Sequence, residues 1–213
     1  WGYNVEGISN GYATVKSALS NPEIEAAISL DSLAVNGLKA PPQDITSNWD
    51  FKDNRARVFI IERDRRDTVI RGYYQPQGNR YYARASMQNM KLALISPFLK
   101  DIISDIEGDA DIEARIVGEG RQATLSGSAT VDDIGATVDY TKVRYRAPKA
   151  ELIIKDNHFI AERVPVSDME GNRGSFSMDI SLERLSNITY DIDVEARDML
   201  VIDTDSKDNG LFY

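Results

Sequence analysis

Side chains that commonly carry out catalysis or bind metals are scarce in this chain of 213 residues. It contains no cysteine and one histidine, His158. The absence of cysteine excludes disulfides, thiolate zinc sites and a cysteine nucleophile, and a single histidine excludes zinc sites built on two. His158 follows Lys-Asp-Asn, which is typical of a turn between strands, and no nucleophile motif accompanies it. We therefore predict an exposed turn histidine, a protein that is not an enzyme, and no cofactor or metal.

Three other patterns resemble functional motifs but favour structural roles. Residues 118–123 fit the G-x-G-x-x-A pattern of dinucleotide-binding loops, yet a strand rather than a helix is expected to follow them. Residues 203–210 have the composition of a calcium loop, but a lysine stands at a ligand position and the glycine is misplaced. Two pairs of carboxylates stand two residues apart, as solvated charges on a strand do: Asp109/Asp111 and Asp191/Asp193.

The elements expected to position any site are strands, because hydrophobicity alternates with a period of two along most of the chain. Residues 175–182 place Phe176, Met178, Ile180 and Leu182 on one face, and residues 190–197, 110–116 and 125–131 alternate in the same way. Clusters of Asn, Gly, Asp and Pro separate these runs. The pattern predicts an all-β fold with a dozen or more long antiparallel strands, each about ten residues or about 33 Å long.

One segment departs from this alternation. From Ser96 to Ile106 the apolar residues recur at helical spacing, with Pro97 at the first helical position and Gly108 beyond the end. We predict a short amphipathic helix over Ser96–Ile106 that covers a patch of apolar sheet.

An internal repeat divides the chain into two similar halves. The matching segments, in order, are 11–21 with 108–118, 24–31 with 125–132, 51–54 with 154–157, 71–72 with 173–174 and 82–90 with 190–199. Their preserved order predicts a first β repeat unit over residues 1–106, which ends in the helix, and a second over residues 107–213. Together they are expected to form one continuous, elongated β domain.

Composition and charge restrict the partners. The net charge is −9, and no run approaches the roughly 18 apolar residues that span a bilayer. The chain begins at a tryptophan and ends without a polar tail, which indicates a piece of a longer protein. Between Phe51 and Arg84 there are nine basic and four acidic residues interleaved with tyrosines. This stretch favours a solvated sheet face, or a contact for anionic lipid headgroups or a partner, over nucleic acid, because the whole chain is acidic.

A sheet built by repeating strands has one apolar face that must be covered. A closed core would bury that face, whereas a curled, elongated sheet would fold over a groove with an apolar interior, which fits an apolar ligand. The candidate groove-lining residues are Ile112, Ala114, Ile116, Leu125, Val131, Phe176, Met178, Ile180, Leu182, Ile192 and Val194.

The order of these segments also resembles a known family. The glycine-spaced strands, Asn21-Pro22-Glu23-Ile24 and the stretch from 154–157 through 168–172 to 198–203 resemble the C-terminal region of the TamB family, the translocation and assembly module proteins of the AsmA-like superfamily. The resemblance covers nearly the whole chain. It implies a protein of the periplasm, anchored to the inner membrane by a segment outside this chain, with an outer-membrane barrel partner of the Omp85 type. It also implies a role in outer-membrane biogenesis, through protein secretion or lipid transport.

Two functions from different classes follow from these observations. The first is a non-enzymatic, periplasm-spanning module whose groove conducts or chaperones lipid acyl chains or nascent outer-membrane proteins. The alternative is a structural or adhesive β-repeat module with a closed core. Binding of a fluorescent apolar probe separates the two, because a closed core leaves the probe no apolar surface.

Overall fold

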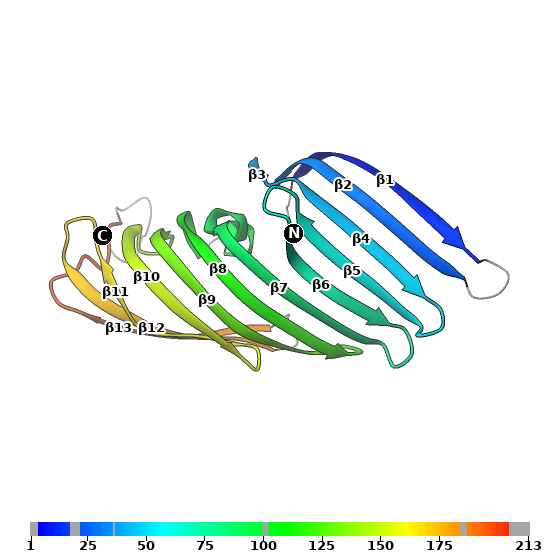
Figure 1. Cartoon of the computed structure of the whole chain (residues 1–213). Coiled ribbons are helices and arrows are strands. Elements are labelled where there is room, and N and C mark those ends of the chain that lie inside the picture. The colour runs from blue at the N-terminus through cyan, green and yellow to red at the C-terminus, as the bar shows by residue number, and fades with distance from the viewer. Residues whose placement is uncertain (1–3, 18–21, 36, 100–101, 184–186, 205–213) are drawn as a thin grey trace. The chain divides into compact units, whose positions relative to one another are not determined.

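The computed structural model of the chain describes residues 4–17, 22–35, 37–99, 102–183 and 187–204, and these are almost entirely β-strands (Figure 1). The described elements are β1 (Val5–Lys16), β2 (Glu23–Val35), β3 (Leu38–Ala40), β4 (Gln43–Asp50), β5 (Arg55–Glu62), β6 (Asp67–Gln75), β7 (Arg80–Lys91), the 3₁₀-helix η1 (Leu92–Phe98), β8 (Ile103–Glu119), β9 (Gln122–Val138), β10 (Val143–Lys155), β11 (His158–Ser167), β12 (Arg173–Glu183) and β13 (Asn187–Ala196). The predicted all-β fold is confirmed.

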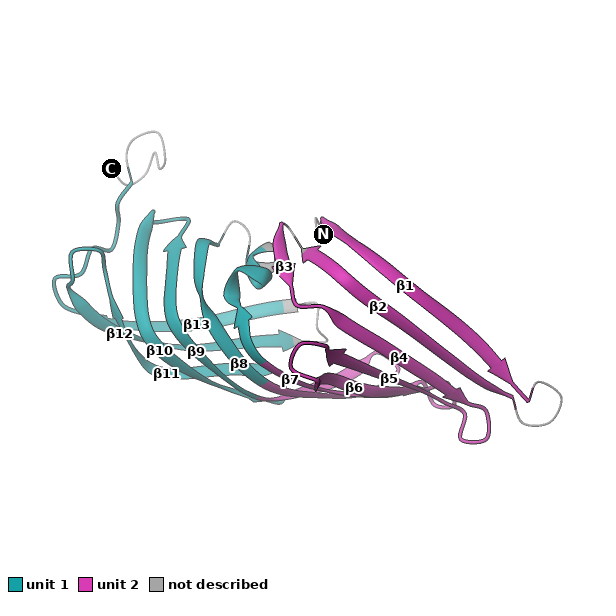
Figure 2. Cartoon of the chain, turned by 45° about the horizontal axis from the view of Figure 1, so that its top comes forward, with its two compact units in different colours: residues 1, 88–112, 128–213 teal, residues 2–87, 113–127 magenta. Residues whose placement is uncertain are grey.

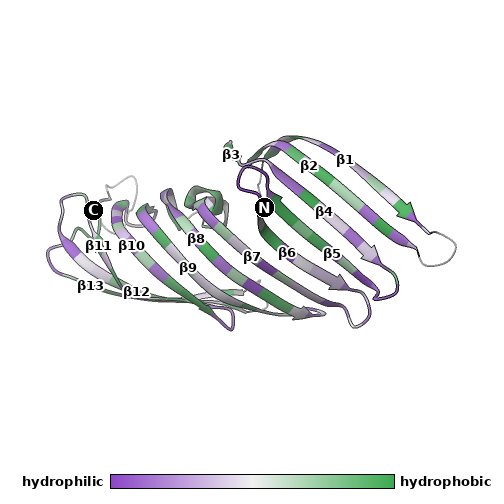
Figure 3. Cartoon of the chain, viewed as in Figure 1, coloured by the Kyte–Doolittle hydropathy of each residue, from purple (hydrophilic) through white to green (hydrophobic). Residues whose placement is uncertain are grey.

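All the strands belong to one antiparallel sheet. Apart from β3, which pairs with β2, the strands are neighbours in chain order from β1 to β13. Among the described residues, β1 pairs only with β2 and β13 only with β12, so the ladder is open at both ends. β8 and β9 have 17 residues each, longer than the ten that we predicted. Figure 3 shows hydrophilic and hydrophobic residues alternating along β8, as a strand with one apolar face requires.

The sheet divides into two compact units, coloured separately in Figure 2. Unit 1 comprises residues 88–112 and 128–213 together with residue 1, and unit 2 comprises residues 2–87 and 113–127. The strands β7, β8 and β9 each contribute residues to both units. These boundaries differ from the predicted repeat boundary at residues 106 and 107. A compact unit reflects contacts, whereas a repeat reflects sequence, so the two divisions need not coincide.

The predicted repeat segments lie on strands of the same rank in two successive sets of six. The first set is β1, β2, β4, β5, β6 and β7, and the second runs from β8 to β13. Residues 51–54 and 154–157, for example, both include the turn between the third and fourth strands of their set. The repeat remains a prediction, and this arrangement is what two copies in series would produce.

The predicted helix over Ser96–Ile106 is wrong in position and type. The described helix is η1, which ends at Phe98, while β8 begins at Ile103. Ser96 lies inside η1 rather than capping it, and Gly108 lies within β8 with a φ of 123°. The β-branched residues from Ile102 onward favour a strand. Ladder pairing with β9 offers residues 103–106 long-range hydrogen bonds that an isolated single turn lacks.

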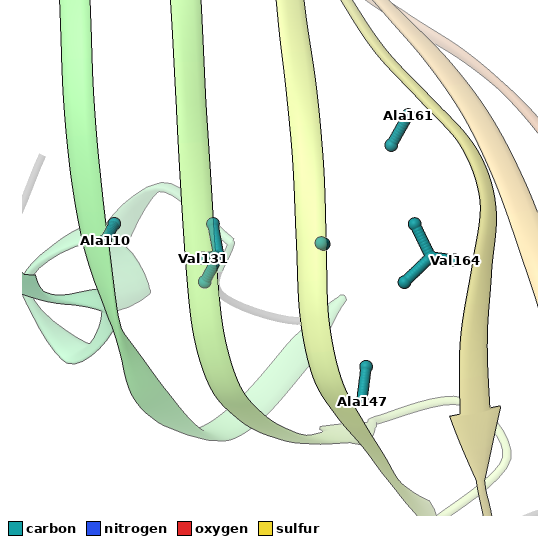
Figure 4. Close-up of a cluster of buried hydrophobic side chains, with 6 residues drawn as sticks. Ala110, Val131, Ala147, Ala161 and Val164 are labelled. Atoms are coloured by element: carbon teal, nitrogen blue, oxygen red, sulfur yellow. The ribbon is translucent and has the colours of Figure 1, made fainter.

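Unit 1 has a core that consists of small side chains. Its buried cluster is formed by six residues on β8, β9, β10 and β11, of which all but Ala150 are labelled in Figure 4: Ala110, Val131, Ala147, Ala150, Ala161 and Val164. Leu92 of η1 packs against the cluster, as do Ile112, Phe176 and Met178. Alanine and valine side chains are small, so this cluster removes less apolar surface from water than a core of larger side chains would.

A short segment after β13 crosses one end of unit 1. The N–H of Leu200 donates to Oδ2 of Asp168 at 2.9 Å, and its carbonyl accepts from the Tyr145 hydroxyl at 2.9 Å. Further along, the N–H of Asp203 donates to the carbonyl of Thr141 at 2.8 Å. This segment, residues 199–203, therefore runs from the end of β13 to the beginning of β10. We call it the return segment.

Asp168 joins the return segment to the turn between β11 and β12. Its carboxylate accepts from the N–H groups of Glu170, Asn172 and Leu200 and from the Asn172 side chain. The residue is buried. The Leu200 hydrogen bond, followed by those from Asn172 and Glu170, lowers the pKa of Asp168 to about 2, against an opposing effect of burial. The ionised form is thus the one that the fold requires.

We expect Asp168→Ala to lower the midpoint of thermal unfolding by several degrees at neutral pH. The substitution leaves three backbone N–H groups without their acceptor. Because the folded pKa lies below the ordinary value of 3.8, the stabilisation by Asp168 is present above about pH 4 and is lost as the pH falls toward 2. Urea unfolding of both proteins should therefore give a stability difference that shrinks between these pH values. A difference that is constant down to pH 2 would contradict this assignment.

Candidate apolar binding face

The apolar side of unit 1 changes from buried to exposed across the sheet. Its six fully buried cluster residues lie on β8 to β11, where other apolar residues such as Ile112 are half-buried. On β12 the apolar residues are half-buried: Phe176, Met178, Ile180 and Leu182. On β13 the exposed fractions are 57% for Ile188, 71% for Tyr190, 53% for Ile192 and 62% for Val194. We call these four residues the β13 row. It is a continuous apolar strip at the sheet edge without cover from the described residues.

The ladder register shows that the β13 row shares its face with β12. Met178 lies opposite Ile192 and Phe176 opposite Val194, while Ile180 pairs with Tyr190 and Leu182 with Ile188. Residues that lie directly opposite each other in an antiparallel pair project to the same side of the sheet. The β13 row therefore continues the side on which Phe176 and Met178 pack against the buried cluster.

The predicted groove-lining residues fall into three groups. Ile112, Val131, Phe176 and Met178 belong to the buried cluster of unit 1 or pack against it. Ile180, Leu182, Ile192 and Val194 lie on β12 and β13, where cover decreases. Ala114, Ile116 and Leu125 are half-buried residues of unit 2. The structure thus brings eight of the eleven candidates together on one face of unit 1, and the other three lie in unit 2.

Sequence reasoning missed the buried centre on β10 and β11. Ala147 and Ala150 are separated by an exposed Pro-Lys pair, and Ala161 and Val164 by an exposed Glu-Arg pair. The ladder between β11 and β12 shifts register between Ala161 and Val164, as a β-bulge does. A spacing of three hides such residues from a search for period two. Paired small residues with that spacing were the available signal.

Unit 2 also has an apolar side. Val15 lies opposite Ile24, Ile24 opposite Trp49, and Trp49 opposite Ala56, so these residues share one face from β1 to β5. All twelve residues of β1 are exposed. The apolar side chains of β1, which pairs only with β2 among the described residues, are therefore exposed to solvent, as those of β13 are in unit 1.

The opposite side of β13 is acidic. Asp191, Asp193 and Glu195 alternate with the β13 row and are exposed. Asp191 lies directly opposite Asp179, whose Oδ1 is 2.8 Å from Nδ1 of His158. The two sides of this edge therefore differ sharply, with aliphatic and aromatic groups on one and carboxylates on the other.

The prediction for His158 needs correction in its position. It is the first residue of β11 rather than part of the turn, which consists of Asp156 and Asn157. Its side chain is half-exposed and bonded to Asp179 across the ladder. The reason is that the turn needs only two residues with positive φ, and Asp156 and Asn157 provide both.

The structure also shows where the dinucleotide-loop and calcium-loop patterns of the sequence lie. Residues 118–123 span the end of β8, a two-residue turn and the beginning of β9, so a strand follows the glycines. Most of residues 203–210 lie outside the described residues. Within the described part of the chain, no group of three or more His, Asp or Glu side chains is arranged to hold a metal ion. No described helix has the length and apolar character needed to cross a membrane.

Among the described residues, the fold and the β13 row together define a single sheet whose apolar side is only partly covered and whose first and last strands each have one partner. Comparisons of the chain with protein-family models, curated proteins and solved structures found no match. The resemblance to the TamB family therefore remains a prediction.

Two kinds of ligand suit the geometry of β13. The β13 row offers apolar side chains that an acyl chain can cover, at about 0.8 kcal/mol for each methylene group removed from water. The outer edge of the strand also offers backbone N–H and C=O groups, which among the described residues pair on the β12 side only. Such an edge pairs with an extended peptide, and the apolar row then specifies alternate side chains of that peptide.

Proposed function

We propose that this chain is a non-enzymatic binding module that holds lipid acyl chains or unfolded outer-membrane protein strands on an uncovered apolar sheet face. The observation that carries the proposal is the β13 row, four large exposed side chains continuous with the side of the sheet that bears the core. A chain of this size seldom leaves such a strip open unless something binds there.

The wider setting of the proposal comes from the resemblance to the TamB family. In that setting the module is a periplasmic part of a larger protein, and that protein is anchored to the inner membrane. An outer-membrane barrel of the Omp85 type receives what the module carries. The open ladder supports this setting because a sheet without a closed end extends by adding further strands.

The experiment that tests the proposal is photocrosslinking at neighbouring positions of β13. A crosslinking residue at position 192 is expected to capture a radiolabelled phospholipid or a urea-unfolded outer-membrane protein, whereas one at position 193 is not. The two positions share the strand and the solvent exposure but face opposite sides of the sheet. Equal capture at both positions would contradict the proposal. Capture of only one of the two ligands identifies the cargo.

Titration with the apolar fluorophore ANS separates the proposal from the closed-core alternative. Strong fluorescence enhancement by the folded chain, reduced when acyl chains are added, is the expected result. A folded chain that leaves ANS fluorescence unchanged would favour the structural or adhesive module, whose apolar face is covered.

A further inference from the structure

The side of unit 2 opposite its apolar face carries an organised set of basic and aromatic residues on three neighbouring strands. Ladder register assigns nine side chains to this face, and we call them the basic array: Arg55, Arg57 and Phe59 of β5, Arg71, Tyr73 and Gln75 of β6, and Arg80, Tyr82 and Arg84 of β7. Five of the nine are arginines, and none is acidic.

Arginines and aromatic rings are neighbours within the basic array. Arg71 lies directly opposite Arg84, and in the next rung Tyr73 lies opposite Tyr82. On the other side of β6, Phe59 lies opposite Arg71 and Arg57 opposite Tyr73. Because like charges in directly opposed positions destabilise a ladder, the Arg71–Arg84 rung is better accommodated when an anion lies over it.

Carboxylates at the border offset only part of this charge. Asp53 pairs with Arg57 at 2.8 Å, and Glu113 with Arg84 at 3.2 Å. A hydrogen bond from Ser86, followed by the interactions with Arg84 and Arg71, lowers the pKa of Glu113, while desolvation by burial opposes it. Asp50 lies opposite Arg55. Glu119 of β8 approaches the turn at Gly78, next to Arg80. Four carboxylates therefore border five guanidinium groups, and the remaining excess is positive on a chain whose net charge is −9.

The aromatic rings are arranged differently from those of a nucleic-acid platform. The rings of Tyr73 and Tyr82 stack on each other at 5.8 Å, and the guanidinium of Arg55 lies 4.8 Å from the centre of the Tyr73 ring. A platform for unpaired bases needs open ring faces, whereas the Tyr73 ring is in contact with both Tyr82 and Arg55. Tyrosine hydroxyls and arginines beside an exposed phenylalanine instead match the layer at which lipid headgroups meet water.

We propose that the basic array docks unit 2 against the surface of a membrane that contains anionic phospholipids. Arg71 and Arg84 contact lipid phosphates, to which guanidinium groups can form paired hydrogen bonds. Phe59, exposed by 37%, lies at the acyl boundary between them and Arg57. The remaining acidic surface is repelled by such a membrane, so the array also selects the face that approaches it. This inference does not depend on the apolar binding face.

The test is sedimentation of the 213-residue chain with phosphatidylcholine vesicles, with and without phosphatidylglycerol. We expect binding only to the anionic vesicles at about 0.1 M salt, and its loss at about 1 M salt, where screening is strong. Each basic residue near an anionic bilayer contributes about a five-fold factor in partitioning, so Arg71→Gln/Arg84→Gln should weaken binding about 25-fold. The charge-preserving Arg71→Lys/Arg84→Lys protein should retain most of it.

The matched control is Arg146→Gln/Arg173→Gln, which removes the same charge from exposed arginines of unit 1. An equal loss in this control, or no binding to anionic vesicles, would overturn the proposal. So would full displacement by millimolar inorganic phosphate, which indicates a discrete phosphate site, or tighter binding to single-stranded DNA. Far-UV circular dichroism verifies that each variant is folded.

Discussion

A single charge on the apolar side of β12 or β13 is expected to abolish ligand capture by this chain without unfolding it. In Ile192→Arg the guanidinium projects from an edge position that is already exposed, so folding is retained. Ligand binding there must desolvate that charge and also forgo the apolar contact. We expect at least about a 30-fold loss of affinity, which corresponds to about 2 kcal/mol. Ile180→Asp on β12 should have the same effect, measured as binding of a fluorescent fatty acid.

The controls lie on the other side of the same strand. Thr189→Arg adds the same charge to the exposed acidic side of β13 and should change the affinity less than two-fold. Asp191→Ala should likewise have little effect, and it removes the repulsion of Asp191 with Asp179. If Ile192→Arg and Thr189→Arg weaken binding equally, long-range charge rather than the apolar row determines affinity, and the proposed function fails.

The largest loss of stability is expected from Gly127→Ala in β9. The φ of Gly127 is 155°, and an added Cβ would overlap the Glu113 carbonyl oxygen and lie 2.8 Å from Cα of Ala114. Both neighbours are backbone atoms of β8, which cannot move without opening the ladder. We expect unfolding to become easier by roughly 2–4 kcal/mol, from strain and steric overlap together. Urea denaturation measures this directly.

Gly120→Ala provides the matched control. Gly120 also has a positive φ, 60°, but nothing lies within 4 Å of its added Cβ. Only the backbone conformation is then penalised, at about 1 kcal/mol. Equal destabilisation by the two substitutions would show that the close approach between β8 and β9 is absent.

Much of the fold followed from alternation alone. Residues 175–182 and 190–197 predicted strands with specified apolar faces, and the register of β12 with β13 places Phe176, Met178, Ile192 and Val194 on one side. The segment 96–106 was misassigned because helical spacing of a few isoleucines also arises where a strand follows a short 3₁₀ turn. Whether such a segment forms a helix or a strand depends on the neighbouring strands with which it can pair. Those strands are distant in the sequence, so local spacing does not reveal them.

The apolar binding face was predictable only in part. Ile112, Val131, Phe176 and Met178 were identified, because each belongs to an uninterrupted alternation. Ala161 and Val164 were not, since Glu162 and Arg163 interrupt the pattern. Arg163 adopts a φ of 48°, which shifts the register so that both apolar neighbours face the same side. A bulge of this kind depends on the partner strand and leaves little trace in a single sequence.

The sequence by itself determined which side chains share a face, because the alternating geometry of a strand converts a period of two into two sides. It did not determine how much of the apolar face is covered. Phe176 and Ile192 occur in similar patterns, yet Phe176 packs against the core and Ile192 is exposed. Only the tertiary structure decided that difference. Cover increases with the number of neighbouring strands, and among the described residues β13 has one neighbour where β12 has two.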